Sequence, residues 1–188
     1  MLFTLSGCVG IPNTYYSTTD DYVVGLRWFD RGMEQGKEEF YQKAAQYWEP
    51  LVEKQDCDAE YRLGLLYFMG KGKPQSFDKA FQLWEKAANT NQQRAQWALG
   101  DLYYQNHENV LHHCNKTPNC NIKKDLTEAL FWYELFKKSA KYDNELKYVN
   151  NIIPKVKLEM TDGEINEIEI KVSQWKPTPK DCKPRNLL

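Results

Sequence analysis

The sequence predicts an all-α fold in which antiparallel helix pairs stack into a solenoid, and two observations carry this prediction. Five residues recur after 36 positions: Ala44, Trp48, Ala59, Gly64 and Tyr67 return as Ala80, Trp84, Ala95, Gly100 and Tyr103. Within each unit the apolar residues are spaced three and four positions apart, as on one face of a helix. Repeats of this length are two-helix units that stack and mostly present a surface to partners. The period is therefore also the first indication of function.

The predicted helical repeat domain covers residues 20–177, and its first helices follow directly from the apolar spacing. They lie at 20–33, 37–54, 58–69, 76–89 and 92–105. Between the third and the fourth, Gly70 can supply a left-handed cap and Pro74 stops the helical pattern. Ser76 or Asp78 can cap the helix that follows. Two pairs and the first member of a third are thus expected before residue 105.

Two glycines interrupt otherwise helical segments at the same register. Gly64 and Gly100 each cost about 1 kcal/mol relative to alanine inside a helix. A cost repeated at one register suggests a purpose, so we expect the neighbouring helix to approach closely at both positions.

The period then fails and resumes. An inserted loop is predicted at about 105–123, after which Ala129 and Tyr133 take the places of Ala80 and Trp84. A later stripe from Leu146 to Val156 predicts a helix that bends or ends near Pro154. Thr161 and Glu164 form a capping-box pattern, and the helix after it is expected to cap the stack. Residues 178–188 are predicted to be a flexible tail.

Composition limits the classes of function. The chain has 188 residues, 41% of them hydrophobic and 27% charged, which fits one globular domain. Its net charge of −1 gives no field that would attract nucleic acid, so no nucleic-acid partner is predicted. No nucleophile elbow, zincin helix or P-loop is present. We therefore predict a protein that is not an enzyme and that has no cofactor.

The N-terminus resembles a bacterial lipobox, because Leu5-Ser6-Gly7 precede Cys8, whose thiol would be lipidated. Residues 1–8 would be a truncated signal, since a secretory signal has a basic start and an apolar stretch of about 7–15 residues. Either the true start lies upstream or the match is accidental. Residues 9–19 are predicted to be a flexible tether. By analogy with lipoproteins, Val9 favours a protein of the bacterial periplasm that is anchored by lipid to the outer membrane.

Without Cys8 the chain has four cysteines, an even number that permits two disulfides in an exported protein. Cys114 and Cys120 share the inserted loop, and a bridge between them would stabilise the fold by about 2–3 kcal/mol. Cys57 and Cys182 would then pair with each other or stay free.

The inserted loop also holds all three histidines: His107, His112 and His113. Histidine and thiolate suit zinc, but the spacing matches no recognised zinc pattern. A metal site, a disulfide-pinned loop and an unpinned polar loop all remain open. We predict no metal site, and we expect these histidines to contact a partner.

Four aromatic residues lie outside the core stripes and are candidates for the groove of the solenoid: Tyr61, Phe68, Trp97 and Tyr104. Rigid rings in a groove make good anchors for a partner. We predict that these residues bind a partner protein.

The repeat resembles the Sel-one-like repeat family, a branch of the tetratricopeptide-like solenoids. The residues that carry the resemblance are spread over one unit: Ala59, Gly64, Tyr67, Gly70, Gly72, Asp78, Ala80, Trp84, Ala87 and Ala88. The resemblance covers about residues 37–177 and implies about three units with right-handed stacking, a concave groove and protein partners. Ser139-Ala140 and the inserted loop depart from the pattern.

The resemblance implies a protein-binding module of the bacterial envelope. A sharper hypothesis is an immunity protein that neutralises an antibacterial lipase toxin delivered by type VI secretion. The alternatives are an envelope scaffold or regulatory adaptor, and a penicillin-hydrolysing branch of the family. That branch has cysteine pairs in every repeat, and here Gln93 stands where Cys57 would need a counterpart.

Overall fold

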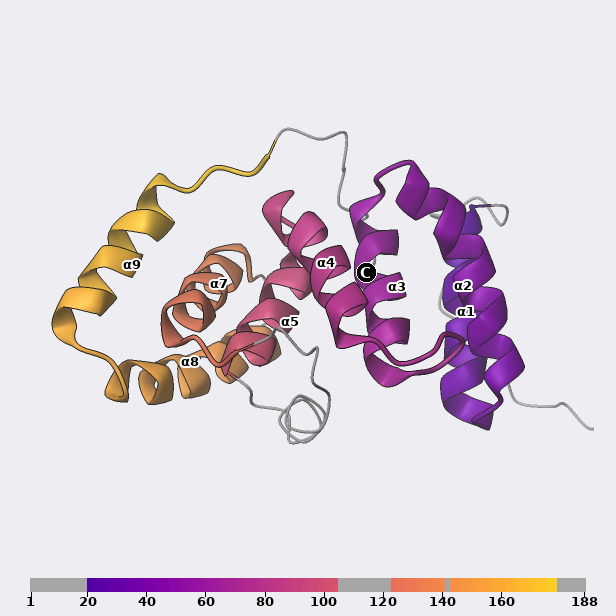
Figure 1. The fold of residues 1–188 in the computed structure, drawn as a ribbon, viewed down its shortest axis with the longest axis horizontal. Helices are drawn as coiled ribbons and strands as arrows, with labels where there is room; N and C mark the ends of the chain where they lie inside the picture. The colour runs from indigo at the N-terminus through magenta and orange to yellow at the C-terminus, as the bar shows by residue number, and fades with distance from the viewer. Residues whose placement is uncertain (1–19, 105–122, 141–142, 179–188) are drawn as a thin grey trace, which may run out of the picture.

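The computed structural model describes residues 20–104, 123–140 and 143–178, and these ranges hold eight helices and no strand (Figure 1). The helices are α1 (Asp21–Gln35), α2 (Glu38–Glu53), α3 (Cys57–Met69), α4 (Phe77–Asn89), α5 (Gln93–Tyr104), α7 (Leu126–Ser139), α8 (Asp143–Leu158) and α9 (Asp162–Gln174). The prediction of an all-α helical-repeat fold is confirmed. The first five predicted helices end within two residues of the observed ones.

The helices pack as successive hairpins along the long axis of the molecule (Figure 1). We call α1–α2 repeat 1, α3–α4 repeat 2 and α5–α7 repeat 3. Helices α8 and α9 both pack against α7 and close the stack at the far end from α1. Buried residues run through all the repeats, so each hairpin covers the apolar face of its neighbour.

Side-chain caps set where the helices begin. Asp20, Asp56, Ser76 and Asp125 each accept a hydrogen bond from a backbone N–H in the first turn of α1, α3, α4 and α7. Of the two predicted caps of α4, the structure uses Ser76. The capping box predicted before α9 is confirmed: Thr161 N–H donates to Glu164 at 2.8 Å, and Glu164 N–H donates to Thr161 Oγ1 at 3.3 Å. Gly70 ends α3 in the left-handed conformation, as predicted, with φ of 64°.

Of the two alternatives predicted at Pro154, a bend or an end of the helix, the end is wrong, because α8 continues through this residue to Leu158. A proline removes one backbone donor, which weakens a helix without necessarily ending it. Here Val149, Ile152 and Val156 are buried against the rest of the stack on either side of the proline. This burial holds the segment in the helical conformation.

Close approach at the two repeat glycines is confirmed. A Cβ on Gly64 would lie 2.5 Å from Trp84 Nε1, and one on Gly100 would lie 2.6 Å from Tyr133 Cδ1. Contacts this short are not found for real Cβ atoms, so only glycine lets the two helices of a repeat pack at this distance. Trp84 also donates from Nε1 to the carbonyl oxygen of Tyr61 at 3.0 Å.

Repeat 1 has the same glycine contact, which the 36-residue period did not predict. A Cβ on Gly25 would overlap the ring of Trp48, and Trp48 Nε1 donates to the Tyr22 carbonyl oxygen at 3.2 Å. The period hides this contact because three more residues separate Gly25 from Trp48 than separate Gly64 from Trp84. Helices α1 and α2 therefore form a full repeat with the same packing as the later ones.

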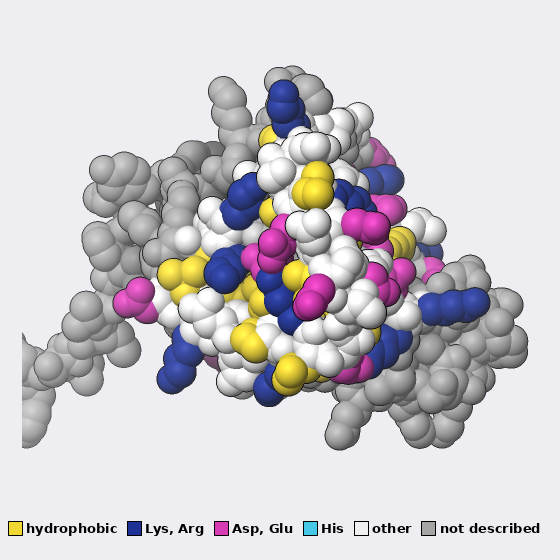
Figure 2. Space-filling model, turned by 90° about the vertical axis from the view of Figure 1, so that its left-hand side faces the viewer, with side chains coloured by type: hydrophobic (Ala, Val, Ile, Leu, Met, Phe, Trp, Pro, Cys, Tyr) yellow, Lys and Arg dark blue, Asp and Glu magenta, His cyan; other side chains and the backbone are white. Residues whose placement is uncertain are grey.

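Helix α9 covers the end of the stack, and the chain after it runs back toward α4. It buries Ile168 and Val172, and the end of the molecule where it lies shows acidic, basic and scattered apolar side chains side by side (Figure 2). Beyond it, Thr178 N–H donates to the Asn89 carbonyl oxygen at the end of α4, at 2.8 Å. Thr178 is the only residue of the predicted flexible tail, 178–188, that the structure describes, and residues 1–8 and 9–19 also lie outside the described ranges.

Candidate functional site

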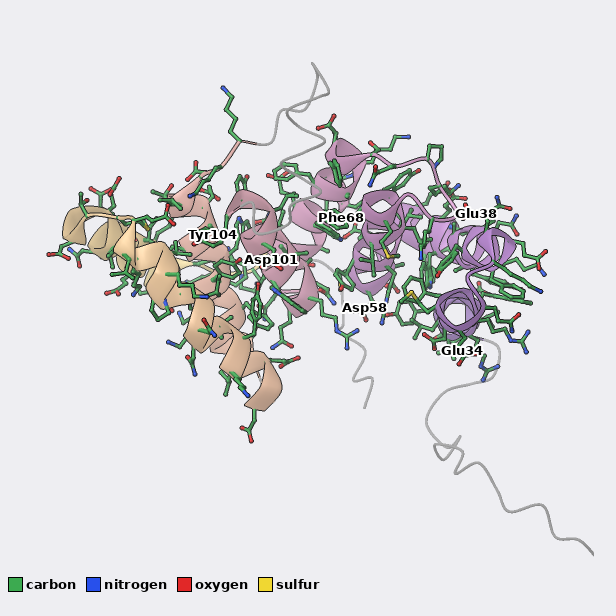
Figure 3. All side chains as sticks on the ribbon, turned by 90° about the horizontal axis from the view of Figure 1, so that it is seen from below. Glu34, Glu38, Asp58, Phe68, Asp101 and Tyr104 are labelled. Carbon is green, nitrogen blue, oxygen red and sulfur yellow. The ribbon has the colours of Figure 1, made fainter. Side chains whose placement is uncertain are left out.

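A cavity of about 430 Å³ opens between repeats 2 and 3, and five aromatic side chains line it. We call it the aromatic pocket. Tyr61 and Phe68 come from α3, Trp84 from α4, Trp97 from α5 and Tyr148 from α8. Figure 3 labels Phe68 on α3 and Asp101 on α5, the two helices that flank the opening.

The glycine register places these rings. Tyr61 lies three residues before Gly64 and Phe68 four residues after it, so the two rings stand about two turns apart on one face of α3. Trp97 holds the first of these positions in α5, three residues before Gly100. The glycines that allow the two helices of a repeat to pack closely therefore also set the positions of the rings that face the groove.

The rings support one another. The Phe68 ring centroid lies 5.3 Å from that of Trp84, and Tyr61 stacks on Trp84 at 6.4 Å. On the other side of the pocket, Trp97 lies 5.2 Å from Tyr148. Trp97 is 37% exposed, so this indole stands at the rim and can meet a ligand without rearrangement.

One buried carboxylate fixes the wall that α8 contributes. Asp101, which is 6% exposed, accepts hydrogen bonds from the hydroxyls of Tyr133 at 2.6 Å and Tyr148 at 2.5 Å. Burial, followed by the nearby Asp101 carboxylate, raises the pKa of Tyr133 above its usual value. Asp101 therefore joins α5, α7 and α8, and it holds Tyr148 in place against the pocket.

Two arginines bring positive charge to this surface. Arg94 is exposed and lines the aromatic pocket, and Arg62 lies one helix away on α3. Burial raises the pKa of Tyr61, and the charges of Arg62 and Arg94 oppose this rise. Both guanidinium groups are thus close enough to act on the Tyr61 hydroxyl.

The equivalent position between repeats 1 and 2, which we call the first groove, is covered. Tyr22 and Phe29 hold the ring positions there, and they are 2% and 7% exposed. The Arg62 guanidinium lies 5.5 Å from the Phe29 ring centroid and 5.8 Å from that of Tyr61. The residue of α5 that corresponds to Arg62, two positions before the glycine, is Ala98, which lines the aromatic pocket. The pocket is open because a methyl group stands where the first groove has a long side chain.

Comparison with known families agrees with this architecture. The Sel1 repeat model matches residues 57–90, 93–106 and 118–139. These stretches of the chain are Sel1 repeats. The match stops at 106 and resumes at 118, inside the range of the predicted insertion, and it leaves out repeat 1, which the structure shows to share the glycine contact.

Two solved structures align with this chain. A protective antigen of uropathogenic Escherichia coli with an SLR fold aligns with a TM-score of 0.65 and 19% identity over 82% of this chain and 29% of that one. A Sel1 repeat protein from Oxalobacter formigenes aligns with a TM-score of 0.49 and 22% identity over 65% of this chain and 45% of that one. The chain thus spans less than a third of the E. coli protein, and that likeness shows the fold. No curated protein matches the chain.

The structure brings three of the four predicted groove residues together, because Tyr61, Phe68 and Trp97 all line the aromatic pocket. Tyr104 lies elsewhere, at the end of α5, where its hydroxyl donates to Glu159 at 3.2 Å. Partner binding by these residues stays a prediction.

Most of the other predicted site residues lie outside the described ranges: Cys8, His107, His112, His113, Cys114, Cys120 and Cys182. Cys57, at the start of α3, is disulfide-bonded, and its partner is not among the described residues. Within the described ranges, no group of three or more His, Cys, Asp or Glu side chains could hold a metal ion. In the same ranges no helix is long and apolar enough to cross a membrane.

Sequence reasoning missed several residues of this site, among them Arg94, Ala98, Asp101 and Tyr148. Ala98 could have been found by aligning α5 with α3 on their glycines, since Ala98 then falls opposite Arg62. Tyr148 had no such signal, because α8 lies after the repeats and follows no repeat register. It reaches the pocket through tertiary packing on α7 and the bond to Asp101.

Proposed function

We propose that this Sel1 repeat protein is a non-catalytic protein-binding module whose aromatic pocket receives an apolar side chain of a partner protein. The observation that carries the proposal is the convergence of Tyr61, Phe68 and Trp97 on one open cavity. Rigid aromatic side chains are enriched among the residues that contribute most to protein interfaces. A pocket whose rings are already packed on one another also loses little entropy when a ligand enters.

The polar groups of the pocket support binding rather than catalysis. The Asp101 carboxylate accepts bonds from two tyrosine hydroxyls, which hold it in a structural role. Among the residues that line the aromatic pocket there is no Ser, Thr, Cys or His that could serve as a nucleophile or a nucleophile's base.

The finer proposal concerns place and partner. It puts the protein in the bacterial periplasm, anchored through Cys8 to the outer membrane, as an immunity protein for a secreted antibacterial lipase. It rests on the lipobox-like segment and on the family resemblance. Loss of lipid labelling in Cys8→Ser would support the anchor, and unchanged labelling would refute it. Stoichiometric inhibition of a lipase encoded by a neighbouring gene would support the immunity role, whereas failure to bind any neighbouring gene product would refute it.

The pocket itself is tested with matched aromatic variants. Trp97 and Tyr47 are 37% and 36% exposed, but Tyr47 lies on α2, away from the pocket. Trp97→Ala should lower the affinity for the partner protein about tenfold or more, as expected for a buried interface anchor. The affinity of Tyr47→Ala should stay near that of the wild type. Ala98→Arg, which copies the first groove, should abolish binding. Equal effects of the two aromatic variants, or normal binding by Ala98→Arg, would refute the pocket as the binding site.

A further inference from the structure

The rim of the aromatic pocket carries a positive charge without a matching acid. Arg94 is exposed, and no ion pair within the described part of the chain includes it. The one acid among the residues that line the pocket, Asp101, is buried and accepts hydrogen bonds from the Tyr133 and Tyr148 hydroxyls. An entering ligand would therefore meet apolar rings first and a guanidinium at their edge.

We infer that the pocket's ligand is an acidic peptide segment, in which a large apolar side chain fills the ring-lined cavity and an adjacent carboxylate pairs with Arg94. The inference rests on the proposed binding function and adds the chemistry of the partner. An arginine fork matches a carboxylate geometrically, and the low-dielectric rings beside it limit screening by water. Arg94 lines the pocket, which places its charge at the rim, and this charge opposes the rise in the pKa of Tyr61.

The test uses two small probes that share a ring and differ in charge, N-acetylphenylalanine and N-acetylphenylalaninamide, titrated into the full chain and followed by NMR. We expect both to shift the resonances of Ala98, with the carboxylate about two- to fivefold tighter, the range for a partly exposed ion pair. Arg94→Gln should remove this difference and leave the amide unchanged. The control is Lys86→Gln, which removes an exposed positive charge on α4.

The outcomes separate the two claims. If the amide binds as tightly as the carboxylate, or if Lys86→Gln acts like Arg94→Gln, the acidic ligand is refuted and the apolar pocket stands. If neither probe shifts Ala98, the binding function of the pocket itself is refuted. Tighter binding of decanoate than of both probes would overturn a peptide partner in favour of a fatty acid.

Discussion

The first groove and the aromatic pocket are built on the same ring positions and differ in the side chain that stands two residues before the glycine of the following helix. In both, a glycine lets a ring of the second helix approach, and aromatic residues flank that glycine on the groove side. The first groove is covered by Arg62, whereas the pocket has Ala98 at the same register. The repeat thus supplies the scaffold everywhere, and one substitution decides where it is open to a ligand.

The two sites also differ in what closes their ends. The first groove lies between repeats 1 and 2, so both of its walls come from helices that follow the repeat pattern. The far side of the aromatic pocket is formed by α8, which belongs to no repeat and is attached through Asp101. The aromatic pocket therefore lies where the periodic part of the molecule meets the non-periodic part.

The largest effect on stability should come from Asp101→Ala, which removes the hydrogen bonds that attach α8 to the aromatic pocket. Among the described residues, the first groove has no such attachment to a helix outside the repeats. The substitution leaves the buried hydroxyl of Tyr133 and the hydroxyl of Tyr148 without their acceptor, at a cost of about 3 kcal/mol for the two groups. Chemical denaturation should show this loss, together with weaker probe binding as Tyr148 moves. Asp101→Asn keeps an acceptor oxygen and should retain most of the stability. Equal losses in the two variants would show that the hydroxyl bonds do not hold α8.

The next largest effect on stability is expected at the glycine contact, which the first groove and the aromatic pocket share. Gly64→Ala places a Cβ against Trp84 and should destabilise the fold by about 2 kcal/mol through overpacking. Gly163→Ala is the matched control, because a Cβ there meets only Thr161 Oγ1, at 4.0 Å. Thermal melts of the two variants test the expectation. A Gly64→Ala protein as stable as the control would mean that the helices can separate without cost.

The features of the repeats that the sequence predicts are those that follow the 36-residue period. Gly64 and Gly100 fall on the 36-residue period, so the repeats and their close packing could be predicted from local pattern. Gly25 could not, because extra residues shift it out of register with Trp48. The groove rings Tyr61 and Phe68 were predicted as aromatic residues outside the core stripe. That they form an open pocket depends on Ala98 and Tyr148, which act through neighbouring helices rather than through their own.

A substitution with a smaller effect on stability should open the first groove. Arg62→Ala removes the side chain over Phe29 and should cost about 1 kcal/mol, the scale of a lost cation–π contact with some packing. It should also create a second probe site, so calorimetry would report two sites for N-acetylphenylalaninamide in place of one. Arg62→Met retains a long side chain and should keep one site. A single site in both variants would show that Arg62 does not close the first groove.

The smallest effect is expected at Tyr104, which tests whether position in the repeat is enough to make a ring functional. Tyr104 stands four residues after Gly100, as Phe68 stands after Gly64, but its hydroxyl donates to Glu159 and its ring lies beneath the Lys124 ammonium. Tyr104→Ala should change probe affinity less than twofold, whereas Phe68→Ala, which removes a pocket wall, should reduce it about tenfold. Titration of both variants with N-acetylphenylalanine measures the difference. Similar losses would extend the binding surface along α5 toward the inserted loop, and the pocket would then be one part of a longer groove.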